Sequence, residues 1–321
     1  LFQGDDDVEK ERTRVVAGNS SEVAAAAIVM RNLVKSYESV SHGRRVSKRA
    51  VNELCLAVQT NEIFGLLGPN GAGKTTTISM LTGLERPSGG SATIGGFDVE
   101  TQIRLVHKKI GVCPQFDHLW PEMSVRQHLI FFALLKGTPR KETELAARQL
   151  AEDVHLDGDV YNKVASKLSG GEKRRLSIAI ALTGSPPVTF FDEPTTGLDP
   201  AVRRNIWSII KAQQAEGRCI VITTHSMEEA DSLCDRIGIM AGGGLRCLGT
   251  QTHLKTKFGD GFKVVMTADS VSRSAEIEAL MLSLSPGAKL AYNTGKQYTY
   301  TVPLASGDVA QVFNTMETSR R

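Results

Sequence analysis

Residues 68–75 read Gly-Pro-Asn-Gly-Ala-Gly-Lys-Thr and fit the pattern G-x-x-x-x-G-K-[ST] of a phosphate-binding loop. The backbone N–H groups of such a turn wrap phosphate oxygens, helped by the positive N-terminus of the helix that follows. Lys74 is placed to reach the β- and γ-phosphates of a nucleotide, and Thr75 to offer its hydroxyl to Mg²⁺. The loop lies between an expected strand at 63–67 and an expected helix at 74–84, which is the context that this motif requires.

Two adjacent carboxylates stand at the end of a second apolar run. Residues 188–191 read Val-Thr-Phe-Phe, typical of a buried strand, and Asp192 and Glu193 follow directly. In nucleoside triphosphatases with a phosphate-binding loop, the first such carboxylate holds Mg²⁺. Successive side chains point to opposite sides of a strand, so Glu193 is placed to take a proton from an attacking water.

A third motif is much rarer than the first two. Residues 168–172 read Leu-Ser-Gly-Gly-Glu, a run that marks proteins in which one nucleotide is sandwiched between two copies of a domain. Combined with the phosphate-binding loop, in this order, it indicates a domain that uses ATP to clamp two domains together.

These motifs make residues 27–255 similar to the nucleotide-binding domains of ABC transporters. The resemblance implies further roles. Gln115 matches the Q-loop, which touches Mg²⁺ and the transmembrane partner, and Asp199 matches the D-loop at the dimer interface. His225 matches the switch histidine that contacts the γ-phosphate, and Tyr37 matches the aromatic residue that stacks on adenine.

The resemblance therefore predicts a full set of site residues, with ATP and Mg²⁺ as cofactors. The expected catalytic residues are Lys74, Glu193 and His225. The expected ATP-binding residues are Tyr37, Gly68, Asn70, Gly71, Ala72, Gly73, Lys74, Thr75, Thr76 and Gln115. The residues expected to contact ATP bound by the opposite subunit are Ser169, Gly170, Gly171 and Glu172. The expected Mg²⁺ ligands are Thr75, Gln115 and Asp192, and the expected dimer contact is Asp199.

The resemblance narrows to subfamily A, whose members mostly move lipids. The supporting runs lie at 113–117, 197–200, 226–230 and 258–262. The acidic stretch at the start of the chain also looks like the one that precedes the second nucleotide-binding domain of that subfamily. We therefore expect an ATP-hydrolysing motor domain that pairs with a second such domain. The fragment itself should be soluble, and should act at the cytoplasmic face of a membrane as part of an integral transporter whose transmembrane domains lie outside this chain.

The elements that must position these motifs follow from the apolar periodicity. Short apolar runs alternate with amphipathic helices, which predicts a parallel sheet with crossover helices. The expected strands are 27–37, 50–58, 63–67, 188–191, 219–223 and 237–240, and the expected helices are 74–84, 124–136, 141–153, 168–182, 202–214 and 227–233. The fold class is α/β: a P-loop NTPase parallel sheet with an antiparallel β subdomain and an inserted helical subdomain at about 116–185.

The pattern changes after residue 261. Strands at 262–266, 289–292 and 297–303 and helices at 272–284 and 307–316 give the order β-α-β-β-α, a ferredoxin-like plait that lacks its last strand. By resemblance this tail is part of a regulatory domain. The expected domains are a tag remnant and flexible leader at 1–24, the ABC ATPase domain at 25–258 and the partial regulatory domain at 259–321.

Composition excludes several other classes. The 321 residues carry a net charge of +3, too small for a broad nucleic-acid-binding face, and the basic clusters at 44–49 and 173–175 are interpreted as solvated faces. Five scattered cysteines without C-x-x-C spacing indicate neither a disulfide framework nor a zinc site. No apolar stretch approaches the ~18 residues that span a bilayer. Residues 1–4 resemble the remnant of a protease-cleaved tag.

Three alternatives remain at this point. The nearest is the nucleotide-binding domain of a bacterial-type drug or polysaccharide exporter, whose motifs are almost the same. A soluble ABC ATPase acting on DNA or ribosomes is disfavoured because only 54 positions separate Gln115 from Ser169, with no heptads or zinc module between them. A regulatory module that binds ATP without turnover is disfavoured by Glu193.

Overall fold

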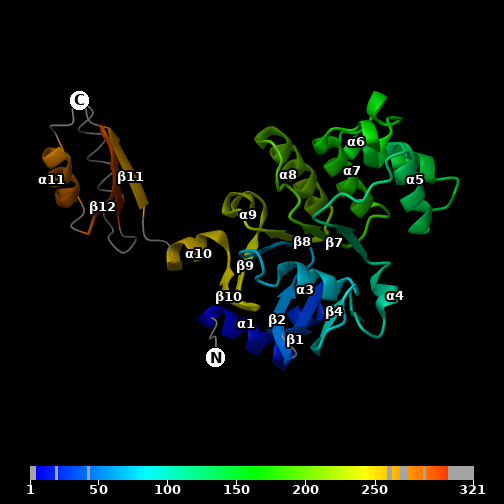
Figure 1. The fold of residues 1–321 in the computed structure, drawn as a ribbon, viewed down its shortest axis with the longest axis horizontal. Coiled ribbons are helices and arrows are strands. Elements are labelled where there is room, and N and C mark those ends of the chain that lie inside the picture. The colour runs from blue at the N-terminus through cyan, green and yellow to red at the C-terminus, as the bar shows by residue number, and fades with distance from the viewer. Residues whose placement is uncertain are drawn as a thin grey trace. The chain divides into compact units, whose positions relative to one another are not determined.

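The computed structural model describes residues 5–18, 21–41, 44–258, 262–267, 274–284 and 287–302. The chain divides into two compact units, Leu1–Gln251 and Thr252–Arg321 (Figure 1). Each unit has its own sheet or sheets and its own core, and each is described by itself below.

A six-stranded sheet organises the first unit, in the order β10-β9-β3-β8-β7-β6. Its strands are β3 (Ile63–Leu67), β6 (Ile110–Cys113), β7 (Val188–Asp192), β8 (Cys219–Thr224), β9 (Arg236–Ala241) and β10 (Gly244–Gly249). All are parallel except β10, which pairs antiparallel with β9. Every residue of β3, β7 and β8 is buried, as expected for central strands with helices on both faces. The expected parallel sheet is therefore confirmed.

Helices connect these strands. They are α3 (Lys74–Leu81), α4 (Ile103–Val106), α5 (Val125–Leu135), α6 (Thr143–Asp153), α7 (Gly170–Leu182), α8 (Pro200–Ala215) and α9 (Met227–Leu233), with 3₁₀ turns at Gly158–Val160 and Ala165–Lys167. Helices α5, α6 and α7 group together, away from β1, β2 and β4 (Figure 1). Capping boxes at Ser124 and Ser169 fix the starts of α5 and α7, because each serine and the residue three positions on satisfy each other's N–H groups.

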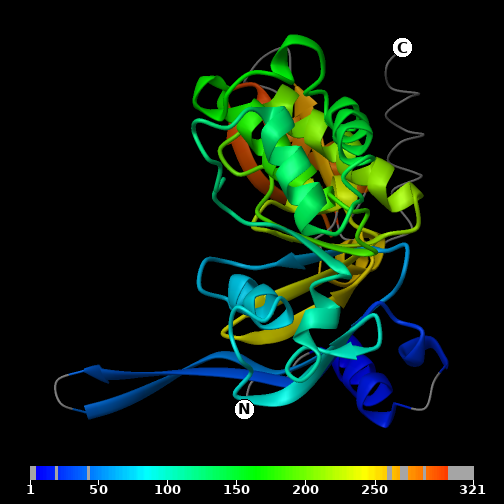
Figure 2. The same ribbon diagram turned by 90° about the vertical axis from the view of Figure 1, so that its right-hand side faces the viewer.

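A second, antiparallel sheet packs in the same unit, in the order β2-β1-β4-β5. Its strands are β1 (Ile28–Ser41), β2 (Arg44–Val58), β4 (Gly89–Ile94) and β5 (Phe97–Asp98). Strands β1 and β2 run well past the ends expected from the sequence and form a long two-stranded ribbon (Figure 2). The ribbon residues are polar and basic, so apolar patterning could not extend the predicted strands. Its register places Tyr37 opposite Lys48.

The expected flexible leader is wrong for residues 6–17, which form helix α1 (Asp6–Ala17); a short helix α2 (Ser21–Ala24) follows. Asp5 caps the N-terminus of α1, and Gly18 ends the helix in the left-handed conformation. Val15 is fully buried in a cluster with Val23, Ala26, Val29, Cys55 and Ala57. The acidic composition suggested a solvated segment, but a buried apolar residue and two caps make it a packed helix.

Helix α10 (Gln251–Phe258) begins at the division between the units, and all of it except Gln251 belongs to the second unit. The second unit also contains a sheet and a further helix. Its antiparallel sheet has the order β11-β13-β12, with strands Phe262–Thr267, Lys289–Thr294 and Gln297–Val302, and helix α11 covers Ser274–Leu284. Met281, Ala288, Tyr298 and Tyr300 form its core. The order and directions fit the first four elements of the expected plait. The expected helix at 307–316 lies outside the described residues.

Among the described residues, no helix combines the length and the apolar character needed to cross a bilayer.

Candidate functional site

The phosphate-binding loop joins β3 to α3 and needs glycine at two points of close approach. A Cβ at Gly68 would lie 2.3 Å from the carbonyl oxygen of Met240, and one at Gly73 would lie 2.5 Å from that of Ala50. Both residues also have positive φ, which side chains rarely adopt. The loop therefore presents backbone N–H groups at the start of α3, the arrangement that binds phosphate.

Lys74 is buried beneath this loop. Its ammonium donates to the carbonyl oxygens of Gly68 at 2.7 Å and Pro69 at 3.2 Å, and lies 3.8 Å from Glu193. A cation held by neutral carbonyls and one carboxylate is well placed to exchange these partners for phosphate oxygens.

An open cleft of about 460 Å³ runs from the loop to strand β1. It is lined by Tyr37, Lys48, Ala50, Asn70, Gly71, Ala72, Gly73, Lys74, Thr75, Thr76, Gln115 and Glu193. The cleft thus gathers the residues expected to bind the base and the phosphates of ATP, apart from Gly68. Lys48 and Ala50 were not predicted. Lys48 is identified as a site residue by its position directly opposite Tyr37, which only the β1–β2 register reveals.

Tyr37 lies at the edge of the cleft with its ring partly exposed. The ammonium of Lys35 lies 5.0 Å from the centre of this ring, a cation–π contact. Lys35 is itself buried and donates to Glu85 at 2.6 Å, just after α3. This contact links the expected adenine platform to the end of the phosphate-loop helix.

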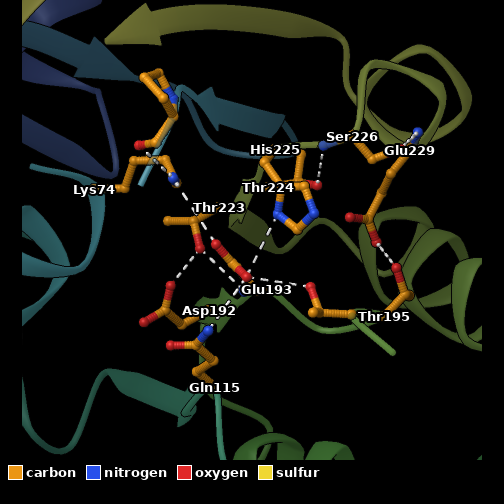
Figure 3. Close-up of polar contacts among 12 residues, drawn as sticks. Lys74, Gln115, Asp192, Glu193, Thr195, Thr223, Thr224, His225, Ser226 and Glu229 are labelled. Carbon is orange, nitrogen blue, oxygen red and sulfur yellow. Dashed lines mark hydrogen bonds and ion pairs between the residues drawn. The ribbon is translucent and has the colours of Figure 1, made fainter. Parts of the chain in front are cut away.

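The two carboxylates at the end of β7 are buried and have separate partners (Figure 3). Asp192 accepts a hydrogen bond from the hydroxyl of Thr223 and lies 3.4 Å from Thr75 Oγ1. Three of the predicted site residues converge on Glu193 instead. Its carboxylate lies 3.3 Å from Gln115 Nε2, 3.5 Å from His225 Nδ1 and 3.8 Å from Lys74 Nζ.

The backbone at Glu193 is held in an unusual conformation. Its φ is +46°, in the left-handed region that a residue with a side chain seldom occupies. The Glu193 N–H donates to both the carbonyl and the hydroxyl oxygen of Thr223 on β8. Strain of this kind persists only where the surroundings fix it, and it concentrates at functional sites.

Thr75, Gln115 and Asp192 supply a hydroxyl, an amide and a carboxylate at one end of the cleft. Oxygen donors of this kind are what Mg²⁺ prefers, usually with one or two carboxylates and phosphate oxygens completing its shell. The short distance from Thr75 Oγ1 to Asp192 brings two of these donors together. The residues present therefore fit a Mg²⁺ ion bound together with a nucleotide.

The remaining predicted residues do not line this cleft. Ser169 is the exposed N-cap of α7, followed by the exposed Gly170, and Asp199 is the exposed N-cap of α8. Glu172 closes the capping box, and the hydrogen bond from the Ser169 N–H lowers the pKa of its carboxyl group. Gly171 packs against Val202 at the start of α8. These residues form a second surface of the same unit.

The interpretation of residues 173–175 as a solvated face is wrong for Arg174, which is 5% exposed. Its five guanidinium N–H bonds lie within hydrogen-bonding distance of six acceptors, so one N–H of Nη1 is shared between two of them. The acceptors are the carbonyl oxygens of Pro114, Gln115, Asp192, Glu193 and Pro194 and the carboxylate of Asp117. Neither charge nor spacing distinguishes Arg174 from its basic neighbours, because only the packing of α7 buries it.

Comparison with known proteins agrees with this geometry. Residues 51–196 match the family described as ABC transporter. The chain is 42% identical over 98% of its length to ABC transporter A family member 12 of Arabidopsis thaliana, and 41% identical over 98% to ATP-binding cassette sub-family A member 2 of Rattus norvegicus. It spans 34% and 13% of the lengths of these relatives.

Solved structures show the same fold. The structure of an ATP binding subunit of an ABC transporter superposes with a TM-score of 0.64 at 26% identity, covering 73% of this chain and 93% of that one. A dimeric ATP-binding cassette in a post-hydrolysis state, bound to ADP and Pi, superposes with a TM-score of 0.63 at 23% identity, covering 70% and 98%.

Fold and site together define an ATPase domain with a phosphate-binding loop, of the ABC type. Residues 51–196 form a domain that matches the ABC transporter family, and the chain is similar over 98% of its length to members of subfamily A.

Proposed function

We propose that this chain is an ATP-hydrolysing motor domain of a lipid-moving ABC transporter. The observation that carries hydrolysis is the convergence of Lys74, Gln115 and His225 on the buried carboxylate of Glu193, at the phosphate end of the cleft. A module that binds ATP without hydrolysing it needs the phosphate-binding loop and an aromatic ring to stack on adenine. It does not need a carboxylate held beside the phosphates.

Each residue then has a distinct role. Lys74 and the N–H groups of residues 70–75 hold the phosphates, and Tyr37 stacks on adenine. Glu193 accepts the proton of the attacking water, and His225, 54% exposed beside it, contacts the γ-phosphate. Thr75, Gln115 and Asp192 would hold a Mg²⁺ ion, which would neutralise charge on the phosphates. Positioning and charge neutralisation suffice, since phosphoryl transfer needs little covalent chemistry from the protein.

The site becomes complete when a second domain packs against it. Ser169 and Gly170 are exposed at the N-terminus of the 13-residue helix α7, where backbone N–H groups attract an anion. They lie outside their own chain's cleft, so we assign them to the γ-phosphate held by the opposite subunit. Asp199, also exposed, belongs to the same interface. ATP binding closes the pair, and hydrolysis reopens it.

The transmembrane partner is assigned to the surface beside Gln115. Phe116 directly after it is 71% exposed, and Trp120, 45% exposed, packs with Phe131 and Phe132 of α5. Exposed apolar side chains gathered in this way mark interaction sites. A membrane partner here would place the domain at the cytoplasmic face of a membrane, and similarity to subfamily A supports lipid as the substrate class.

The domain limits are proposed on the same basis. Residues 25–258 form the ATPase domain, with α1 as an additional packed element, and residues 259–321 form part of a regulatory domain. The β11-β13-β12 sheet, with its own core of Met281, Tyr298 and Tyr300, supports an independent second fold.

The test is Mg-ATP turnover of the wild-type chain and of Glu193→Gln, with size-exclusion chromatography in ATP. We expect turnover to fall at least about 100-fold in the variant, because the general base is lost, while ATP binding remains. The variant should also elute as a dimer in ATP, since the closed pair no longer reopens. Equal turnover of the two proteins would contradict the role of Glu193.

A further inference from the structure

We infer that Arg174 is a positioning residue that fixes Gln115 and Glu193 relative to each other and ties both to helix α7. This inference deepens the proposed function and rests on it. Arg174 touches neither the cleft nor, in the proposed pair, the nucleotide of either subunit. It acts by holding the backbone of Gln115 and Glu193, whose side chains face the cleft.

The arms of the guanidinium group serve two different segments. Nε and Nη2 donate to the carbonyl oxygens of Pro194, Asp192 and Glu193, at 2.7, 3.1 and 3.2 Å. Nη1 donates to those of Pro114 and Gln115, at 2.7 and 3.3 Å, and to the Asp117 carboxylate at 3.0 Å. One planar group therefore joins the end of β7 to the loop that follows β6.

These two segments carry the side chains that meet in the cleft. Gln115 Nε2 lies 3.3 Å from the Glu193 carboxylate, and Glu193 has a strained backbone whose carbonyl oxygen is one of the acceptors. The guanidinium thus opposes relaxation of that strain and sets the separation of the two segments. A lysine could not replace it, because a single ammonium on a flexible stem cannot satisfy six acceptors arranged around a plane.

Arg174 also lies on the helix that begins with Ser169, one turn after its start. The residues proposed to cap the opposite subunit's ATP are therefore on the same rigid element as the link to Gln115 and Glu193. A shift of α7 caused by the partner's nucleotide would reach this chain's own carboxylate through Arg174. The geometry gives each subunit a physical connection between the two nucleotides of the pair.

The adjacent Arg175 offers a matched control. Its Nη1 donates to the carbonyl oxygens of Val154 and His155, near the end of α6. It has the same charge, lies on the same helix and also ties it to backbone carbonyls, but these carbonyls are far along the chain from the catalytic segments. Arg175→Lys therefore tests anchoring of α7 without disturbing β7 or the Gln115 loop.

The experiment compares wild type, Arg174→Lys, Asp117→Ala and Arg175→Lys for ATP turnover and for the Kd of ATP with and without Mg²⁺. For Arg174→Lys we expect kcat to fall at least about tenfold with KM changed less than about threefold, because the carboxylate is misplaced but the phosphate loop is intact. The enhancement of ATP affinity by Mg²⁺ should also shrink, because Gln115 and Asp192 move. Asp117→Ala should show a smaller fall in kcat and a smaller change in the Mg²⁺ effect. Arg175→Lys should show neither change.

The inference would be overturned if Arg174→Lys and Asp117→Ala both kept the wild-type kcat and the wild-type dependence on Mg²⁺. It would also be overturned if Arg175→Lys lost as much kcat as Arg174→Lys. If Arg174→Lys fails to fold, Asp117→Ala decides, because it removes one partly exposed acceptor and leaves the arginine. A wild-type chain that binds no ATP overturns the proposed function, and the inference with it. If the wild-type chain binds and hydrolyses ATP and both Arg174→Lys and Asp117→Ala behave like it, the inference is overturned and the proposed function stands.

Discussion

At the scale of single residues, the site depends on side chains that fix backbone as much as on those that face the cleft. Motif spacing and strand context predicted Lys74, Asp192 and Glu193, and the family resemblance added Gln115. The structure brings all four close together at one end of the cleft. The role of Arg174 could not be predicted, because it depends on hydrogen bonds to six acceptors in segments far from it in the sequence. No local sequence pattern contains this information.

His128 fixes the loop that follows Gln115. Its Nε2 accepts from the Trp120 N–H at 3.0 Å, and its Nδ1 lies 2.9 Å from the carbonyl oxygen of Ser124, so only the neutral form with the proton on Nδ1 satisfies both. Burial lowers the pKa of His128. Below pH ~6.5 the folded protein therefore holds fewer protons here than the unfolded chain. This contribution to stability is complete above that pH and is lost as the pH falls from there through the lower pKa of the folded state.

We predict that His128→Gln weakens the pH dependence of stability. Denaturant unfolding is measured at about pH 7.5 and about pH 5.5, on either side of the ordinary histidine pKa. Wild type and the control His118→Gln, exposed in the same loop, should both lose stability at the lower pH, and His128→Gln should lose clearly less. An unchanged pH difference in His128→Gln would contradict this assignment.

At the scale of elements, helix α1 is the clearest departure from expectation. Its Glu11 carboxylate accepts from the Ala57 N–H and pairs with Arg14, and its Val15 side chain completes a small core with β1 and β2. An element attached in this way supports the strands that carry Tyr37 and Lys48, rather than serving as a tether.

We predict that Val15→Ala lowers the free energy of unfolding by about 1–3 kcal/mol, because two buried methyl groups are lost and a cavity is left. The neighbouring Val16, 51% exposed, provides the control, and Val16→Ala should stay within about 0.5 kcal/mol of wild type. Denaturant unfolding followed by circular dichroism measures both. Equal effects of the two variants would mean that α1 does not pack in solution as it does here.

Most elements could be predicted because their apolar period is strong. The bounds of β3 and α9 match the sequence prediction to the residue, since each is an apolar or amphipathic run with clear ends. Strand β10 and the outer part of the β1–β2 ribbon were missed because they are polar or glycine-rich, and pairing rather than patterning defines them. Helix α1 was missed because one buried valine carries little weight in an acidic stretch.

At the scale of the whole molecule, the proposed function makes this chain one of two domains that share their nucleotides. Its cleft holds the residues for one nucleotide. The signature surface, formed by Ser169 and Gly170 at the start of α7, is exposed and separate from that cleft. The order of the motifs along the chain predicted both the nucleotide cleft and the residues that contact the opposite subunit's nucleotide. What the sequence could not give is the separation of the two surfaces, which follows from the packing of α7 on β6 and β7. In the proposed head-to-tail pair, the cleft of each domain would face the signature surface of the other.

The most direct test mixes two variants that are each inactive. Lys74→Ala removes the phosphate contact and keeps the signature surface, while Ser169→Arg blocks the signature surface and keeps the cleft. If ATP is sandwiched between subunits, a mixed pair contains one intact site, and an equimolar mixture should recover up to about a quarter of wild-type turnover. Activity that stays at the level of the separate variants would contradict an ATP site shared between two subunits.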